Sequence, residues 1–143
     1  MEAFLKKGID KMRFGMKRQD VLDLYGPPDR EFRDEDKNIT WIYNMQRWRL
    51  TFYEDEEFRL GYLITAHPEL ELFGNRIVGR EVEEVKAQLK PKGFDKWEEE
   101  AIDITTAHFN EDHWVVLQSE FGVVTKFELG AALVNDMFVW AHL

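Results

Sequence analysis

The stretch ITWIYNMQRWRLTFYEDEEFRLGYLIT, residues 39–65, decides the fold class. It is rich in β-branched and aromatic residues, which favour strands, and two turn-forming stretches interrupt it. Trp48, Leu50 and Phe52 alternate with polar residues, as they would in a strand with one solvated face. The pattern predicts three antiparallel strands joined by two hairpins.

A short amphipathic helix is predicted just before these strands. The segment GMKRQDVLDLYGPPD, residues 15–29, places apolar residues on one side of a 3.6-residue period and charged residues on the other. Gly26 suits the left-handed position after a helix, and Pro27 and Pro28 prevent the helix from resuming. Four residues farther upstream also have helical spacing and predict a helical arm: Phe4, Leu5, Ile9 and Met12.

The second half of the chain repeats this order. In GREVEEVKAQLKP, residues 79–91, aligning Gly79 on Gly15 also places Val85 on Val21. This segment therefore predicts a second helix. Strand-like stretches then follow at residues 102–109, 114–118 and 123–129.

We therefore predict an α+β fold of two tandem halves, residues 1–66 and 67–143, that form one compact unit. Each half is a helix followed by an antiparallel β-meander, with the helices packed on one face of the sheet. The linker between the halves is expected to add a strand around three apolar residues: Leu70, Leu72 and Ile77.

Composition excludes several classes of function. The chain has 143 residues, 28 acidic against 19 basic, and a net charge of −9. Such a charge repels nucleic acid and anionic lipid and favours a basic partner. The chain has no cysteine, which excludes disulfides and thiolate sites. We expect a cytoplasmic protein that binds neither nucleic acid nor membrane, because no signal peptide or membrane span is evident.

Part of the first half resembles a known family. The motif consists of Gly15, Met16, Val21, Gly26 and Pro28, followed by an aromatic strand with Trp41 and Tyr43. It resembles the small outer-membrane assembly lipoproteins (SmpA/OmlA) and the tandem fold of β-lactamase inhibitor protein. The resemblance covers residues 9–65 and implies a helical pair against an antiparallel sheet that serves as a protein-binding scaffold. The lipoproteins carry a signal and an acylated cysteine, so membrane anchoring does not carry over.

Catalytic motifs are not evident, and we expect no metal or cofactor. Ser119 is the single serine, and it lies in LQSEF without a nucleophile elbow. The segment HFNEDH contains His108, Glu111 and His113, which could bind a divalent cation if a hairpin brought them together. We interpret these three residues as solvated turn residues, and keep a metal- or carboxylate-dependent enzyme as an alternative.

Acidic and aromatic residues are the candidates for partner binding. Acidic runs at residues 34–36, 54–57 and 98–100 fall at predicted turns, where hairpin tips could meet a basic protein. The alternation of apolar and polar residues along the predicted strands places Trp48 and Trp114 on the inner face of the sheet. The candidate partner-binding residues are Tyr53, Asp55, Glu56, Glu57, Trp97, Glu98 and Glu99.

These observations predict a non-enzymatic, acidic protein-binding module, such as an immunity protein or inhibitor that neutralises a basic effector. The alternative is an adaptor that forms a homodimer through the apolar tail GAALVNDMFVWAHL, residues 130–143. An exposed tail of this composition would aggregate, so we expect it to dock on its own sheet or against a second copy.

Overall fold

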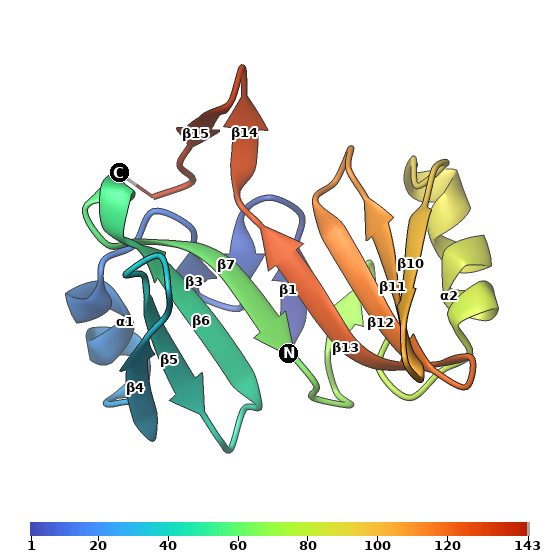
Figure 1. The fold of residues 1–143 in the computed structure, drawn as a ribbon, viewed down its shortest axis with the longest axis horizontal. Helices are drawn as coiled ribbons and strands as arrows, with labels where there is room; N and C mark the ends of the chain where they lie inside the picture. Colours follow the sequence, from blue (N-terminus) through green and yellow to red (C-terminus); the bar gives the residue numbers. More distant parts are fainter. Residues whose placement is uncertain (143) are drawn as a thin grey trace.

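The fold is dominated by one antiparallel sheet of eight strands (Figure 1). The computed structural model describes residues 1–142. The strands of this sheet are β4 (Arg30–Arg33), β5 (Ile39–Tyr43), β6 (Trp48–Tyr53), β7 (Arg59–Thr65), β10 (Glu98–Ile102), β11 (Thr105–Asn110), β12 (Val115–Glu120) and β13 (Val123–Gly130). Their order across the sheet is β10-β11-β12-β13-β7-β6-β5-β4, so β10 and β4 are its edges.

The other elements are short. A five-stranded sheet consists of β1 (Glu2–Phe4), β2 (Gly8–Ile9), β3 (Met12–Arg13), β8 (Glu71–Leu72) and β9 (Asn75–Arg76). A C-terminal hairpin pairs β14 (Ala132–Val134) with β15 (Met137–Val139). The helices are α1 (Arg18–Tyr25), α2 (Val82–Leu89) and the 3₁₀ turns η1 (Glu54–Glu56) and η2 (Lys90–Lys92). Among residues 1–142, neither eight-residue α-helix has the length or apolar character that crossing a membrane requires.

The large sheet is continuous across the middle of the chain. Strands β7 and β13 lie side by side at its centre, where Leu63 opposes Leu129 and Tyr62 opposes Gly130. The four strands that follow α1 are thereby joined to the four that follow α2 (Figure 1). The smaller sheet is also shared, because β1 pairs in parallel with β8 of the linker.

The expected α+β class of two tandem helix-plus-meander halves is wrong. The protein is mostly β: fifteen strands accompany only two short α-helices in residues 1–142, and the large antiparallel sheet is not divided into two units. The helical arm predicted from Phe4, Leu5, Ile9 and Met12 is wrong, because this segment forms the short strands β1, β2 and β3 and the turns between them. The backbone turns sharply there, with positive φ at Lys6 and Asp10 and at Gly8 between them.

The strands predicted in residues 39–65 are confirmed as β5, β6 and β7. Their buried face carries the alternating residues of the pattern, with Trp48 at 2% exposure and Leu50 and Phe52 wholly buried. The linker does form strands, as expected, and the predicted stretch 102–109 is split by a turn between β10 and β11.

Candidate functional site

The two ends of the large sheet differ in composition. Because antiparallel strands alternate in direction, the turns β4–β5, β6–β7 and β11–β12 all fall at the same end. We call this the acidic end, and its carboxylates are Asp34, Glu35, Asp36, Glu54, Asp55, Glu56, Glu57, Glu111 and Asp112. The turns at the opposite end carry exposed apolar residues instead: Met45, Ile104 and Phe121.

Two of the acidic runs, distant in sequence, meet at this end. The backbone N–H of Glu54 donates to Asn38 Oδ1 at 3.0 Å, which ties the β6–β7 turn to the β4–β5 turn. The Asp34 carboxylate shapes its own turn by accepting the backbone N–H groups of Asp36 and Asn38, each at 2.9 Å. The fold therefore gathers like charges that the sequence keeps apart.

The C-terminal hairpin places an aromatic stack beside these turns. Tyr53 stacks on Phe138 at a ring-centroid distance of 5.5 Å, and Phe138 stacks on Trp140 at 4.6 Å. Gly61 lies beneath the stack, where an added Cβ would collide with the Tyr53 ring. The N–H of His142 donates to the carbonyl of Phe14 at 2.9 Å, so the tail docks on its own chain as far as residue 142.

Carboxylates and rings share a cavity at this position. Its volume is about 560 Å³, and its lining includes Asp36, Tyr53, Asp55, Glu56 and Phe138. Burial, with the nearby carboxylates, raises the pKa of Tyr53 to about 12, so its hydroxyl stays protonated at neutral pH. Carboxylates beside aromatic faces are the groups that receive a lysine or arginine side chain.

The predicted site residues fall into two groups. Tyr53, Asp55 and Glu56 line the cavity, and Glu57 follows them in a left-handed turn, 3.7 Å from the Lys17 ammonium.

The other group lies away from the cavity at the acidic end. It consists of Trp97, just before β10, and of Glu98 and Glu99 in β10, at the far edge of the sheet. Trp97 is half-buried against Phe94, at a centroid distance of 5.7 Å. The sequence prediction missed Phe138, whose contribution depends on the fold of the tail.

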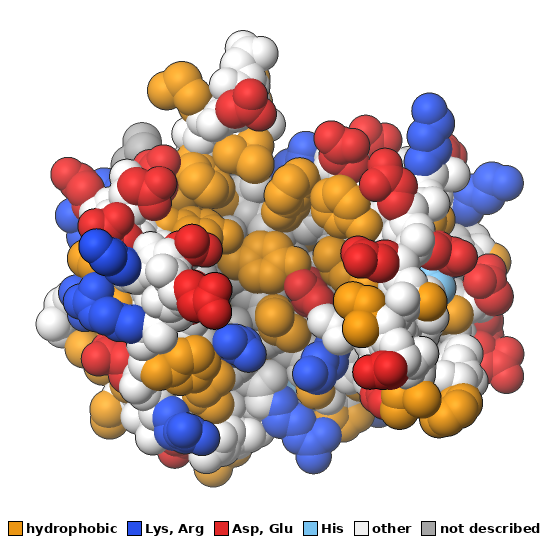
Figure 2. Space-filling model, viewed as in Figure 1, with side chains coloured by type: hydrophobic (Ala, Val, Ile, Leu, Met, Phe, Trp, Pro, Cys, Tyr) orange, Lys and Arg blue, Asp and Glu red, His pale blue; other side chains and the backbone are white. Residues whose placement is uncertain are grey.

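The open face of the sheet carries a band of hydrophobic side chains between charged borders (Figure 2). At the β7–β13 junction the Tyr62 hydroxyl and the Gln118 amide both donate to the Glu128 carboxylate. Burial and the Glu128 charge raise the pKa of Tyr62, which keeps the phenol protonated. Both oxygens of Glu128 are engaged, so this network holds the junction rather than offering a free acid.

The expected inner position of Trp114 is wrong. Trp114 has a positive φ of 53° in the β11–β12 turn, which takes it out of the alternation of β12. It lies half-buried over Gly130 and meets Phe109 edge-on at a centroid distance of 5.1 Å. Trp114 therefore joins the partly exposed aromatic residues and not the core.

Three side chains are linked by polar contacts in the order of a serine triad, on the face of the large sheet opposite Glu128. His108 Nε2 is 2.8 Å from Ser119 Oγ, and His108 Nδ1 is 3.1 Å from Glu99 Oε1. Lys86 of α2 binds the same Glu99 oxygen at 2.6 Å. Ser119 is only 4% exposed, next to the last residue of β12 at an irregularity in its pairing with β13, so its hydroxyl is closed to a substrate.

The residues of the alternative metal site do not converge. His108 faces Ser119 and Glu99, whereas the His113 ring stacks on Phe94 at 4.2 Å. Within residues 1–142 no three His, Asp or Glu side chains are placed to hold a metal ion.

Comparison with solved structures places the fold. An extracellular protein containing a SCP domain, from Bacillus anthracis, is 13% identical, with a TM-score of 0.53 over 90% of this chain and 50% of its own. A cysteine-rich secretory protein from Staphylococcus aureus is 9% identical, with a TM-score of 0.50 over 82% of this chain and 43% of its own. This chain therefore spans about half the length of either structure, and the likeness is one of fold alone.

The resemblance to the outer-membrane lipoproteins and the β-lactamase inhibitor fold is wrong. Two solved structures that share this fold are the extracellular protein containing a SCP domain and the cysteine-rich secretory protein. No family model matches the chain, and no curated protein matches it either. The motif of Gly15, Gly26 and Pro28 reflects how a short helix is begun and stopped, which unrelated folds also require.

Proposed function

We propose that this protein is a non-enzymatic binding module whose acidic end binds a basic protein. The observation that carries the proposal is the meeting of two acidic turns with the Tyr53–Phe138–Trp140 stack at one end of the sheet. Carboxylates attract and orient a basic partner, and aromatic rings supply the apolar area that anchors an interface.

Within this class, we propose an immunity protein or inhibitor that neutralises a basic effector. Effectors that act on nucleic acid carry positive charge, and a partner with a net charge of −9 would be drawn to them at a high association rate. An inhibitor blocks its effector by binding it tightly and needs no catalytic group. This is consistent with the burial of Ser119 and with the hydrogen bonds that engage both oxygens of Glu128.

Capture from a lysate of the native cells tests the proposal. Immobilised wild-type protein should retain a basic protein at low salt and lose it at high salt, because exposed charge pairs are screened. The Asp55→Lys variant reverses one charge inside the cavity at the acidic end and should lose most of the retained protein.

The matched control is Glu69→Lys, which makes the same change in net charge at an exposed position outside the acidic end. It should retain the partner as the wild type does. Equal retention by Asp55→Lys and the wild type, or no retained basic protein at all, would rule out the acidic end as the binding surface.

A second candidate function is homodimerisation through the C-terminal hairpin. Register places Val134 opposite Met137 on the face that points away from the sheet, and both side chains are exposed, as is Val139. Replacing Met137 by Lys leaves the docked Phe138 and Trp140 in place. If the hairpin mediates a dimer, Met137→Lys should convert it to a monomer in analytical ultracentrifugation, and an unchanged mass would exclude this face.

A further inference from the structure

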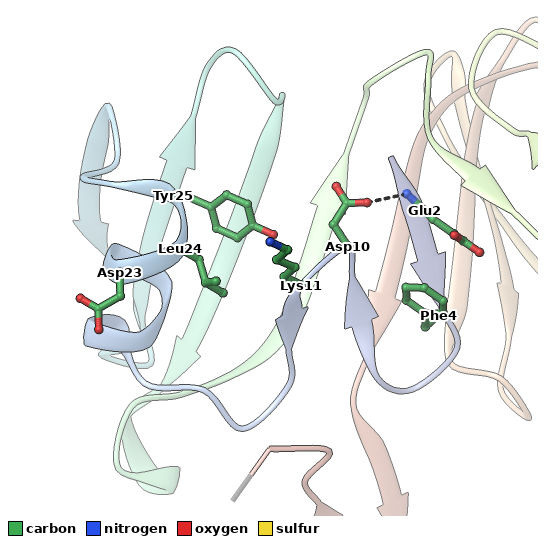
Figure 3. A pocket seen from close by; sticks show the side chains of 7 residues that line it. All are labelled: Glu2, Phe4, Asp10, Lys11, Asp23, Leu24 and Tyr25. Atoms are coloured by element: carbon green, nitrogen blue, oxygen red, sulfur yellow. Dashed lines mark hydrogen bonds between the residues drawn. The ribbon is translucent and has the colours of Figure 1, made fainter.

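The two ends of helix α1 border open cavities of opposite charge. The cavity beside the C-terminal end, about 760 Å³ in volume, is lined by three carboxylates and one ammonium (Figure 3). The cavity beside the N-terminal end, about 370 Å³ in volume, is lined by the cations Lys17 and Arg18, and Glu57 is the single acid among its described lining residues. In a chain with a net charge of −9, a cavity with an excess of positive charge is an exception.

The guanidinium of Arg18 is held by an aromatic ring and not by a carboxylate. Its central carbon lies 5.1 Å from the centre of the Phe58 ring, and that of Arg33 lies 5.5 Å from the same ring. Within residues 1–142, neither arginine has a carboxylate within ion-pair distance. A neutral ring therefore gathers two positive charges that no ion pair of the described chain neutralises.

The turn that supplies Phe58 is strained. Glu57 and Phe58 adopt left-handed backbone conformations in succession, with φ of 56° and 57°. Bulky residues rarely adopt this conformation, and strain of this kind collects at binding sites. The Phe58 N–H holds the turn by donating to the carbonyl of Tyr53 at 2.8 Å. The strained turn thus places the Phe58 ring in the wall of the cavity, against Arg18.

The rest of the wall is apolar and well fixed. Leu22 of α1 and Trp41 of β5 line the cavity together with Phe58. Trp41 is only 4% exposed and its N–H donates to Glu31 at 2.6 Å, whereas Leu22 and Phe58 are half-buried and remain accessible. An aromatic ring that entered would remove apolar area of these two side chains from water and could pack against the Phe58 ring. A ligand with one anionic end and one aromatic end matches this arrangement.

We propose that this cavity binds a carboxylate that is joined to an aromatic ring. The carboxylate accepts N–H donors of the Arg18 guanidinium, whose planar fork suits two oxygens, and of the Lys17 ammonium. The ring lies against Leu22 and Phe58. The Lys17 ammonium is 3.7 Å from the exposed Glu57 carboxylate, a weak surface pair that a ligand carboxylate can replace.

A small aromatic acid and a peptide that ends in phenylalanine present the same group, so both can occupy the site. The proposal does not rest on the binding of a basic protein at the acidic end.

Titration with 3-phenylpropanoate at fixed ionic strength, followed by the NMR shifts of backbone amides around the cavity, tests the site. Binding to the wild type should be saturable. Arg18→Gln removes the guanidinium and should raise the dissociation constant at least about tenfold, the usual loss for a hydrogen bond to a charged group. Glu57→Gln releases the Lys17 ammonium from its acid and should lower the dissociation constant.

Three controls make the test specific. Arg76→Gln makes the same change in charge as Arg18→Gln at an exposed position of β9, outside the cavity, and should leave the dissociation constant unchanged. The uncharged 3-phenylpropanamide has the ring without the charge, and propanoate has the charge without the ring. Each should bind at least about tenfold more weakly than 3-phenylpropanoate. Thermal melts check that each variant folds.

The proposal is overturned if 3-phenylpropanoate gives no saturable shift, if neither Arg18→Gln nor Glu57→Gln changes the dissociation constant, or if the amide or propanoate binds as tightly as the aromatic acid. N-acetyl-glycyl-phenylalanine distinguishes the two sources of the group. If it binds as tightly as 3-phenylpropanoate, the site accepts the end of a peptide, and if 3-phenylpropanoate alone binds, the site selects a small aromatic acid.

Discussion

Single polar atoms decide much of the local energetics in this protein, and Tyr25 offers the sharpest case. Removing a buried hydroxyl that has no partner removes a desolvation cost, so Tyr25→Phe should raise the free energy of unfolding by about 1 kcal/mol. Urea denaturation measures this value.

Tyr43→Phe is the matched control for that prediction. The Tyr43 hydroxyl donates to the carbonyl of Gly26 at 2.8 Å, and its loss leaves an acceptor unpaired. This variant should therefore lower the free energy of unfolding, by about 1 kcal/mol. A loss of stability in both variants would mean that Tyr25 has a hydrogen-bond partner in solution.

His108 makes stability depend on pH. Burial first, and the Lys86 ammonium second, lower the pKa of His108 below its ordinary value of 6.5, and Glu99 only partly offsets them. The unfolded chain then takes up the proton at a higher pH than the folded chain. Stability from this group is fully present above about pH 6.5 and is lost as the pH falls through the lowered value.

Urea denaturation at pH 7.5 and at pH 5.5 checks this sign. The wild type should lose more stability on acidification than His108→Gln, which cannot titrate but can still hydrogen-bond Ser119 and Glu99. An equal loss in both proteins would show that carboxylates, and not His108, set the pH dependence. The folded pKa of Glu99 is also lowered, chiefly by the Lys86 hydrogen bond, and its contribution is lost only at lower pH.

Among the elements, strand β13 shows how a glycine fixes a neighbouring aromatic residue. Gly130 has ordinary backbone angles, so alanine is allowed there by conformation, but its Cβ would overlap the Trp114 indole. Gly130→Ala should lower the free energy of unfolding by about 1–3 kcal/mol, the usual cost of overpacking.

A double-mutant cycle with Trp114→Ala isolates the cause. In the Trp114→Ala background the space above Gly130 is open, and the alanine should cost far less than it does beside the indole. Equal costs in the two backgrounds would show that the backbone, not the ring, requires glycine.

Strands with one buried face could be predicted from sequence, and those without one could not. Strand β6 shows clear alternation because one side of it faces the core, and the more fully buried β5 and β7 could be recognised by their β-branched and aromatic residues. All five residues of edge strand β10 are exposed, so its sequence shows no alternation and resembles a solvated acidic turn. In residues 1–13, helical spacing of apolar residues coincides with strand pairs that are too short to show a period.

The candidate site was predictable only in part, for a related reason. Tyr53, Asp55 and Glu56 lie in one turn, so their proximity is local and can be read from the sequence. Asp36 and Phe138 come to the same cavity through strand pairing and hairpin docking, which are contacts between distant segments. No local pattern encodes such contacts.

For the molecule as a whole, the β7–β13 junction determines whether the chain unfolds in one step. Leu63 and Leu129 oppose each other there and are wholly buried. Leu63→Ala should lower the free energy of unfolding by about 2–5 kcal/mol, the range for truncating a buried leucine.

Because both sheets include strands from each side of the chain, the two sides should lose stability together. Hydrogen exchange measures this: amides of β5 and β12 should show the same decrease in protection in Leu63→Ala. A decrease confined to β5 would indicate two units that unfold separately, contrary to the continuous sheet.

The exposed edge strand β10 has a consequence for growth of the sheet. An open sheet offers unpaired backbone groups at its edge, and a second molecule could extend it strand by strand toward a fibril. In β10 three successive glutamates, Glu98 to Glu100, occupy that edge. A second β10 laid beside it would set three carboxylates against three others, so charge repulsion opposes growth of the sheet at this edge.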